Sequence, residues 1–204
     1  ENRRLLHNLM PQSLAERYQR GETAIAEHHD NVSVVYAELV GFDEYACNLT
    51  DAEEVERLNV LMRGFDEAAQ KAGIEKVRTL RGGYLASSGL SVPRVDNVRR
   101  AVDFAQQMQA VVERFRDQNH ATIGLRVGVD TGTVTSGLVA RTNLAYDLWG
   151  DAVNLANRAR TVSVEPGIYV SQSVRDRLQD TVTFSDAGTV ELRGAKQNVW
   201  KVGP

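Results

Sequence analysis

The sequence contains one cysteine, Cys47, among 204 residues. A single thiol cannot form an intrachain disulfide, and it cannot supply the several thiolates of a zinc or iron–sulfur site. We therefore expect a domain from a reducing compartment, held together by its apolar core rather than by cross-links. Hydrophobic residues make up 42% of the chain, which at this length is enough for one globular domain.

Long apolar runs are also missing from the sequence. No stretch approaches the roughly 20 apolar residues that a membrane-spanning helix needs. The opening residues ENRRLL have neither the pattern of a signal peptide nor an initial methionine. We interpret the chain as a cytoplasmic domain cut from a longer protein, and a membrane anchor or a sensor domain upstream is compatible with this interpretation.

Basic charge is not in excess. Lysine and arginine number 24 against 27 aspartate and glutamate residues, which gives a formal net charge of -3. Proteins that bind nucleic acid normally carry a basic patch or stripe. The short cluster of Arg94, Arg99 and Arg100 is better explained as the solvated face of a helix. We therefore expect no nucleic-acid partner.

The spacing of apolar residues predicts alternating strands and helices in the main part of the chain. Strands are predicted where apolar and β-branched residues alternate, and helices where apolar residues recur every three to four positions. The predicted core elements are a strand at 32–39, a helix at 52–72, strands at 75–80 and 84–88, a helix at 95–115, and strands at 123–130 and 133–139. The last two strands are predicted to form a hairpin that turns at Thr131-Gly132. This β-α-β-β-α-β order predicts an α/β (α+β) fold of the ferredoxin-like type, with the helices on one face of an antiparallel sheet.

Shorter elements flank this core. Residues 1–30 are predicted to form a helical segment and a polar connector, with an amphipathic helix that is interrupted at Pro11. Its apolar stripe either packs on its own domain or pairs with a second copy of the chain. Residues 31–204 form the main domain. After the core, this domain adds helices at 151–159 and 171–178 and strands at 167–170, 190–192 and 199–202.

Six segments, in order, resemble the catalytic domain of class III nucleotidyl cyclases, the adenylate and guanylate cyclases. The segments are LLHNLMPQSLAERY, VVYAELVGF, KVRTLRGGYLASSGL, RVGVDTGTVTSGLV, YDLWGDAVNLANR and VELRGAKQNVWKV. Any one of them alone would be a weak signal, but six in order make a chance similarity improbable. The resemblance covers nearly the whole chain and implies a helical transmitter followed by a cyclase homology domain.

The resemblance implies a reaction in which the ribose 3′-oxygen of ATP, or of GTP as the alternative, attacks the α-phosphorus and expels pyrophosphate. Such phosphoryl chemistry depends on positioning and on stabilisation of charge, and in the family Mg²⁺ or Mn²⁺ ions held by two aspartates contribute to both. The family's sites form between two cyclase domains. The implied partner is therefore a second copy of this chain or another cyclase domain.

The two metal positions depart from the family pattern. Glu38 stands where the first metal aspartate belongs, and its side chain is one methylene longer. Mg²⁺ demands near-ideal octahedral geometry, so this change makes Glu38 a poor replacement. Gly82 stands where the second aspartate belongs and supplies no side-chain ligand. We expect this chain to be defective in metal binding.

Three positions match residues that contact the substrate in the family. Arg78 stands where a lysine marks adenine specificity or a glutamate marks guanine specificity, and the alternative is a strand arginine with its head in solvent. Asp147 matches the acceptor for the adenine amino group, and the alternative is a turn residue that caps the next helix. Arg193 aligns with a triphosphate-binding lysine, and the alternative is a solvated cation at the end of a strand.

Asn154 and Arg158 lie four positions apart in a predicted helix, which places them on one face, one turn apart. The resemblance implies that Asn154 orients the ribose and that Arg158 stabilises charge on the α-phosphate in the transition state. These residues belong to the catalytic half of the site that carries no metal ligands.

Three hypotheses follow from this distribution. The chain is the half of a heterodimeric cyclase that lacks metal ligands, or a non-catalytic homologue that binds nucleotide or relays a signal by dimerisation, or a weakly active homodimer that uses Glu38 and one metal ion. Outside the family, the alternative is a ferredoxin-like regulatory module in which the motifs are only packing remnants. Retention of Asp147, Asn154 and Arg158 favours the first hypothesis.

Overall fold

The computed structural model describes residues 2–22, 24–140 and 144–203. Residues 1 and 23 of the predicted N-terminal segment lie outside this part. The helices are α1 (Asn2–Leu9), α2 (Gln12–Gln19), α3 (Phe42–Ala46), α4 (Asp51–Ala72), α5 (Asn97–Asn119), α6 (Asp151–Ala159) and α7 (Gln172–Leu178). The strands are β1 (Ala26–Val40), β2 (Glu75–Leu80), β3 (Gly83–Ser88), β4 (Gly124–Ala140), β5 (Leu144–Trp149), β6 (Gly167–Ser171), β7 (Phe184–Leu192) and β8 (Ala195–Val202). None of the described helices combines the length and the apolar character needed to cross a bilayer.

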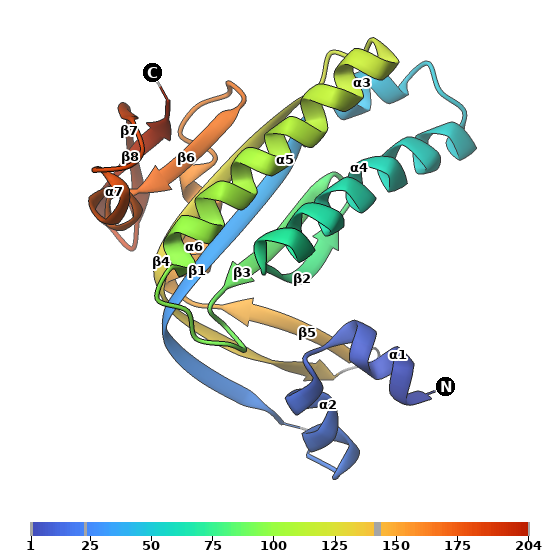
Figure 1. The fold of residues 1–204 in the computed structure, drawn as a ribbon, viewed down its shortest axis with the longest axis vertical. Coiled ribbons are helices and arrows are strands. Elements are labelled where there is room, and N and C mark those ends of the chain that lie inside the picture. The colour runs from blue at the N-terminus through green and yellow to red at the C-terminus, as the bar shows by residue number, and fades with distance from the viewer. Residues whose placement is uncertain (1, 23, 141–143, 204) are drawn as a thin grey trace.

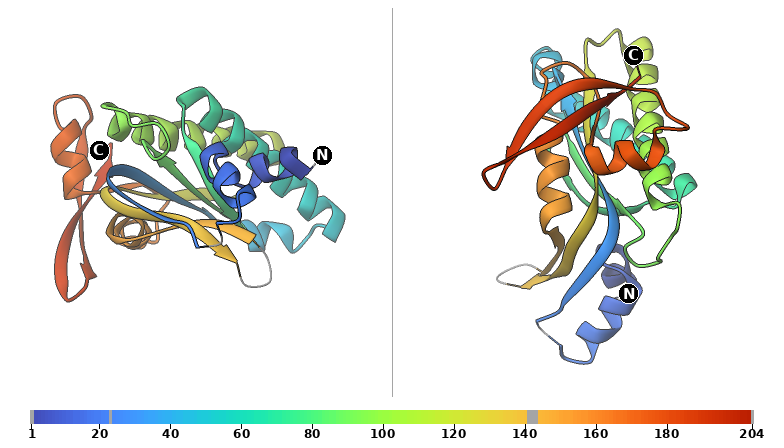
Figure 2. Two further views of the ribbon diagram at one scale, coloured as in Figure 1. Left: turned by 90° about the horizontal axis from the view of Figure 1, so that it is seen from below. Right: turned by 90° about the vertical axis from the view of Figure 1, so that its left-hand side faces the viewer.

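One eight-stranded sheet organises the molecule (Figure 1). Its order is β2-β3-β1-β4-β6-β8-β7, and β5 pairs with β4 beside this path. Strands β2, β3, β1 and β4 are antiparallel neighbours, so the predicted ferredoxin-like core is confirmed. Helices α4 and α5 lie on one face of the sheet and α6 lies on the other (Figure 2).

The central strand β1 is buried on both faces from Val32 to Val35, whereas its first residues are not buried. Val35 belongs to the core cluster under α4 and α5, together with Phe65 and Phe104. Val34, the preceding residue, points the other way and packs with Ala152 and other residues of the α6 side. Successive side chains of a strand point to opposite faces, so β1 needs apolar residues at both kinds of position.

Helix α4 shows why the sequence folds locally as predicted. Thr50 caps the helix by accepting a hydrogen bond from the Glu53 backbone N–H, and the Glu53 side chain accepts one from Thr50 in return. Leu61 and Phe65 lie on the buried face. Gly73 ends the helix in the left-handed conformation, at φ 66°. The predicted helix and its glycine stop are confirmed.

The predicted hairpin at residues 123–139 is wrong. Residues 124–140 form the single long strand β4, and Thr131 and Gly132 stand opposite Ser33 and Val32 of β1 in the ladder. The glycine does not turn the chain, because β1 extends far enough to pair with both halves of β4. Strand β1 also begins at Ala26, so the end of the predicted polar connector belongs to the sheet. Strand β4 also pairs antiparallel with β5.

The N-terminal helices pack on their own domain. Met10, Leu14 and Ala15 are buried in the cluster that also contains Val77 and Tyr146. This contact favours the first of the two alternatives for the apolar stripe. Leu5 and Leu9 stay more than half exposed, so part of that stripe is free to meet another surface. Pairing with a second copy remains a prediction.

Candidate active site

Helix α6 presents Asn154 and Arg158 to the outside. Its sheet-facing residues Ala152, Ala156 and Ala159 are completely buried, and the small side chains let the helix lie close to the strands. Asn154 and Arg158 are both exposed. Within the part of the chain that the structure describes, neither side chain has a hydrogen bond or an ion pair. The two groups are therefore available to something outside this chain.

The close approach of α6 to β4 depends on Gly128. A Cβ atom at this position would lie 1.7 Å from the carbonyl oxygen of Ala156 and 3.0 Å from the backbone nitrogen of Arg160. The helix backbone therefore rests directly on the strand, which fixes how Asn154 and Arg158 are presented.

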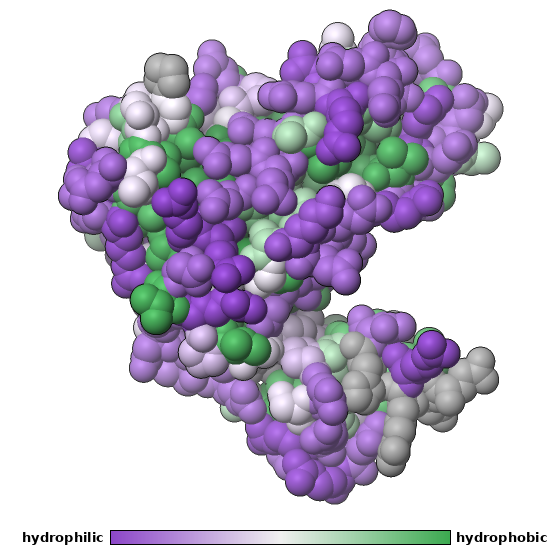
Figure 3. Space-filling view, in the orientation of Figure 1, coloured by the Kyte–Doolittle hydropathy of each residue, from purple (hydrophilic) through white to green (hydrophobic). Residues whose placement is uncertain are grey.

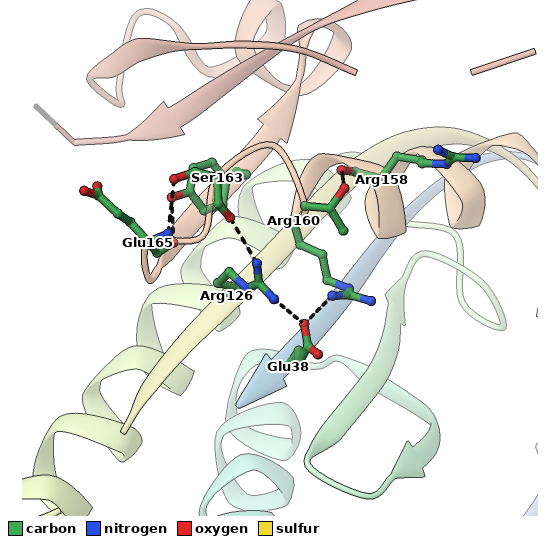
Figure 4. Close-up of polar contacts among 8 residues, drawn as sticks. Glu38, Arg126, Arg158, Arg160, Ser163 and Glu165 are labelled. Atoms are coloured by element: carbon green, nitrogen blue, oxygen red, sulfur yellow. Dashed lines mark hydrogen bonds and ion pairs between the residues drawn. The ribbon is translucent and has the colours of Figure 1, made fainter. Parts of the chain in front are cut away.

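Glu38 of β1 is bound by two arginines (Figure 4). Arg126, opposite it on β4, donates from Nη2 to Oε2 at 3.0 Å. Arg160, the residue that follows α6, donates from Nη1 to the same oxygen. Arg160 lies two positions after Arg158, which is about 200° around a helix. Arg158 therefore points outward while Arg160 points to the sheet.

Gly82 lies next to this carboxylate and offers no ligand. It has a φ of 70°, and its carbonyl oxygen accepts a hydrogen bond from the Leu39 N–H at 2.7 Å. Glu38, Gly82 and Arg126 line one cavity of about 300 Å³. Among the described residues, no group of three or more His, Cys, Asp or Glu side chains could hold a metal ion.

The site therefore does not fit a divalent cation. The one carboxylate at the first metal position already accepts hydrogen bonds from two guanidinium groups, and the second metal position has no side chain. The sequence identified Glu38 and Gly82 but missed Arg126 and Arg160. The sequence did contain one indication of this contact. Arg160 continues the alanine-rich face of the helix, and a buried arginine needs a partner for its charge.

Arg78 and Asp147, both predicted to contact the base, lie against each other. Nε of Arg78 on β2 lies 3.2 Å from Oδ1 of Asp147 on β5. The same aspartate oxygen accepts a hydrogen bond from the Leu148 N–H at 2.9 Å. Asp147 does not cap α6, whose N-cap is Gly150 without a side-chain hydrogen bond. A base would have to compete with the ion pair for both groups.

Arg193 lies at the start of α6. It occupies the turn between β7 and β8 in the left-handed conformation, at φ 51°, and its Nη2 atom lies 2.8 Å from Oδ1 of Asp151. Its side chain is 72% exposed, so both the solvated role and a role toward an anionic ligand stay open.

A cavity of about 720 Å³ lies beside Arg78 and is large enough for a small-molecule ligand. Glu75 and Arg78 of β2 and Tyr146 of β5 line one side, and the junction of α1 and α2 around Pro11 lines the other. Figure 3 shows the hollow between α4 and the N-terminal helices. The N-terminal segment thus borders the cavity at Arg78, the predicted base-recognition residue.

A family model described as the adenylate and guanylate cyclase catalytic domain matches residues 24–202. This chain belongs to that family. An adenylate cyclase of Mycobacterium tuberculosis is 36% identical over 191 residues, an alignment that covers 93% of this chain and 43% of the relative. The chain therefore spans less than half the length of that relative.

Solved structures of cyclases have the same fold. The adenylyl cyclase CyaB from P. aeruginosa superposes with a TM-score of 0.81 at 20% identity, covering 88% of this chain and 96% of that chain. The guanylate cyclase domain of RhGC from Catenaria anguillulae, in complex with GTP, superposes with a TM-score of 0.79 at 25% identity, covering 87% and 98%. Relatives of both nucleotide specificities are thus similar to this cyclase domain.

Among the residues that the structure describes, one further carboxyl outside the positions above, that of Asp130, has a strongly shifted pKa. Asp130 of β4 is 5% exposed, and this burial raises its pKa to about 6. The Ser171 hydroxyl donates to Oδ1 of Asp130 at 2.5 Å and opposes the shift, since it stabilises the charged form. Ser171 is also the N-cap of α7. Asp130 thus links β4 to the start of α7.

We expect Asp130 to make the cyclase domain less stable as the pH rises. Its pKa is higher in the folded state than in the unfolded chain, so the stabilisation is fully present below about pH 4 and is lost as the pH rises through about 6. The loss should be about 2–3 kcal/mol. Urea unfolding of the wild type and of Asp130→Asn, compared at about pH 4 and about pH 8, isolates this contribution. Parallel pH profiles of the two proteins would contradict it.

Proposed function

We propose that this chain supplies the ribose- and phosphate-contacting half of a heterodimeric adenylate cyclase site, and that it produces little or no cyclic nucleotide alone. The proposal is based on a contrast between the two halves of the site. Asn154 and Arg158 are exposed on α6 and have no partner within the described residues, whereas Glu38 is occupied by Arg126 and Arg160. The half of the site without metal ligands is available, and the metal-binding half is not.

The proposed roles follow from the chemistry of the side chains. Asn154 can donate to and accept from the ribose, which orients the attacking 3′-oxygen. Arg158, one turn later, can place its guanidinium against the α-phosphate as negative charge shifts during displacement. The metal carboxylates of the same site would come from the partner chain, because Glu38 is paired with two arginines and Gly82 has no side chain to offer.

ATP is the proposed substrate. Asp147 carries an acceptor that suits the amino group of adenine, a group that guanine does not present at that position. Arg78 would have to give up its ion pair with Asp147 when the base binds, and its planar fork differs from an ammonium group. GTP stays the alternative substrate, since the family includes enzymes for both nucleotides.

A second candidate function is a nucleotide-binding or dimerisation module without catalysis. The Arg78–Asp147 ion pair supports the dimerisation module, because the two groups proposed to recognise the base are paired with each other in this chain. The third hypothesis, a weakly active homodimer, requires Glu38 to recruit a metal ion. The arrangement of Arg126 and Arg160 makes that costly.

The test is complementation with a cyclase domain that keeps both metal aspartates but carries alanine at its own asparagine and arginine. We expect no cyclic AMP from either protein alone, in Mg²⁺ or in Mn²⁺, and clear formation from the mixture. Product from this chain alone would establish the homodimer. No product from the mixture, with ATP binding retained by calorimetry, would establish the nucleotide-binding module.

A further inference from the structure

We infer that Arg126 and Arg160 together take the place of a divalent cation at Glu38, and that Arg160 keeps metal ions away from this carboxylate. The inference concerns this chain alone, and it holds whether or not the chain forms half of a heterodimeric site. It identifies Arg160 as a residue that opposes metal binding at Glu38, in addition to the missing ligand at Gly82.

The charges of the cluster match those of a metal site. Each guanidinium carries one positive charge at any physiological pH, so Arg126 and Arg160 bring two positive charges to Glu38. A divalent cation would bring the same two. Both arginines donate to the same atom, Oε2 of Glu38. The two positive charges are therefore placed at one carboxylate oxygen, where a metal ion would bind.

Arg160 is held in place by more than its ion pair. Its side chain is only 16% exposed, and its guanidinium carbon lies 5.0 Å from the centre of the Tyr36 ring. Arg126 is 20% exposed and donates from Nη1 to the Ser163 carbonyl at 3.1 Å. The Glu38 side chain itself is 39% exposed, so water and salt screen the ion pairs in part, while the burial of the two arginines restricts where their guanidinium groups can move.

Displacement by a metal ion would leave Arg160 without compensation. Glu38 is the only carboxylate that pairs with Arg126 or Arg160 in the described part of the chain. The Nε atoms of both arginines are already buried without a hydrogen-bond partner there. A metal that took Oε2 would leave two adjacent guanidinium groups unpaired and beside the new cation, which is strongly unfavourable.

Loss of the second ligand at Gly82 is a separate cause of weak metal binding, so the test must restore that ligand first. Gly82→Asp meets no steric obstacle, and the left-handed backbone at position 82 costs an L residue roughly 1–2 kcal/mol. A Cβ there would have Leu39 Cβ as its nearest neighbour, at 3.9 Å, and aspartate is among the residues that tolerate a positive φ. Position 82 lines the same cavity as Glu38, so the new carboxylate enters that cavity.

The experiment is a Mn²⁺ titration followed by electron paramagnetic resonance, in which the signal of free Mn²⁺ falls as the ion binds. We expect Gly82→Asp alone to bind weakly and Gly82→Asp/Arg160→Gln to bind at least about tenfold more tightly. The matched control is Gly82→Asp/Arg158→Gln, which also removes one positive charge, but from the outer face of α6. It should bind like Gly82→Asp.

Two further variants show whether Glu38 is the ligand and whether the gain depends on the glutamine. Adding Glu38→Gln to Gly82→Asp/Arg160→Gln should abolish the gain, because the freed carboxylate is the ligand. Gly82→Asp/Arg160→Met replaces the glutamine variant if circular dichroism shows that the latter is unfolded, and the same gain is expected. Equal Mn²⁺ affinity of Gly82→Asp with and without Arg160 would overturn the inference, as would an equal gain from Arg158→Gln.

Discussion

Replacement of Arg158 by alanine is expected to reduce cyclic AMP formation by the complemented mixture about a hundredfold to a thousandfold. The guanidinium is proposed to act on charge that develops only in the transition state, so its loss should lower the turnover number much more than it raises the KM for ATP. Steady-state kinetics of the mixture, with this chain in excess over its partner, measures both parameters.

The control for this substitution is Arg114→Ala. Arg114 is an exposed arginine of α5, on the face of the sheet opposite α6, and its removal changes the net charge of the domain equally. We expect the kinetics of the mixture to be unchanged by it. If Arg158→Ala and Arg114→Ala gave the same activity as the wild type, the proposed half-site would be wrong.

Replacement of Arg158 is also expected to have little effect on the structure. Its side chain lies on the exposed face of α6 and makes no ion pair with the described residues, so alanine should leave the free energy of unfolding within about 0.5 kcal/mol of the wild type. A large loss of activity without a loss of stability would therefore separate a catalytic role from a folding role.

The parts of the fold that the sequence predicts are those with local signals. Helix α4 has a capping box at one end, a glycine at the other and an apolar face between them, all within about 24 residues of each other. The spacing of Asn154 and Arg158 is equally local, since a helix alone places them on one face. Both predictions required no knowledge of distant segments.

The sequence could not predict features that depend on distant pairing. Strand β4 continues through Gly132 because β1 supplies ladder partners on both sides of that glycine, and β1 lies about a hundred residues earlier. The cluster at Glu38 joins residues that are 88 and 122 positions apart. The substitutions at Glu38 and Gly82 indicated a defective metal site, but only the fold brings in the arginines that occupy it.

Replacement of Gly128 by alanine is expected to destabilise the domain by about 3 kcal/mol and to remove the activity of the complemented mixture. The added Cβ would meet the carbonyl oxygen of Ala156 at 1.7 Å and its carbon at 2.8 Å. These are backbone atoms and cannot rotate away, so α6 must move off β4. Asn154 and Arg158 would move with it.

The matched control for Gly128→Ala is Gly132→Ala on the same strand. A Cβ at position 132 would lie 4.0 Å from the Ala152 Cβ, an ordinary contact, so we expect a change within about 0.5 kcal/mol. Urea unfolding of both variants measures the stabilities, and the complementation assay at a temperature where both are folded measures the site. Similar values for the two would mean that α6 adjusts to the extra methyl group, and that the close contact at Gly128 does not fix the orientation of the catalytic face. If only Gly128→Ala lost stability and activity, the positions of Asn154 and Arg158 would depend on the close contact between α6 and Gly128.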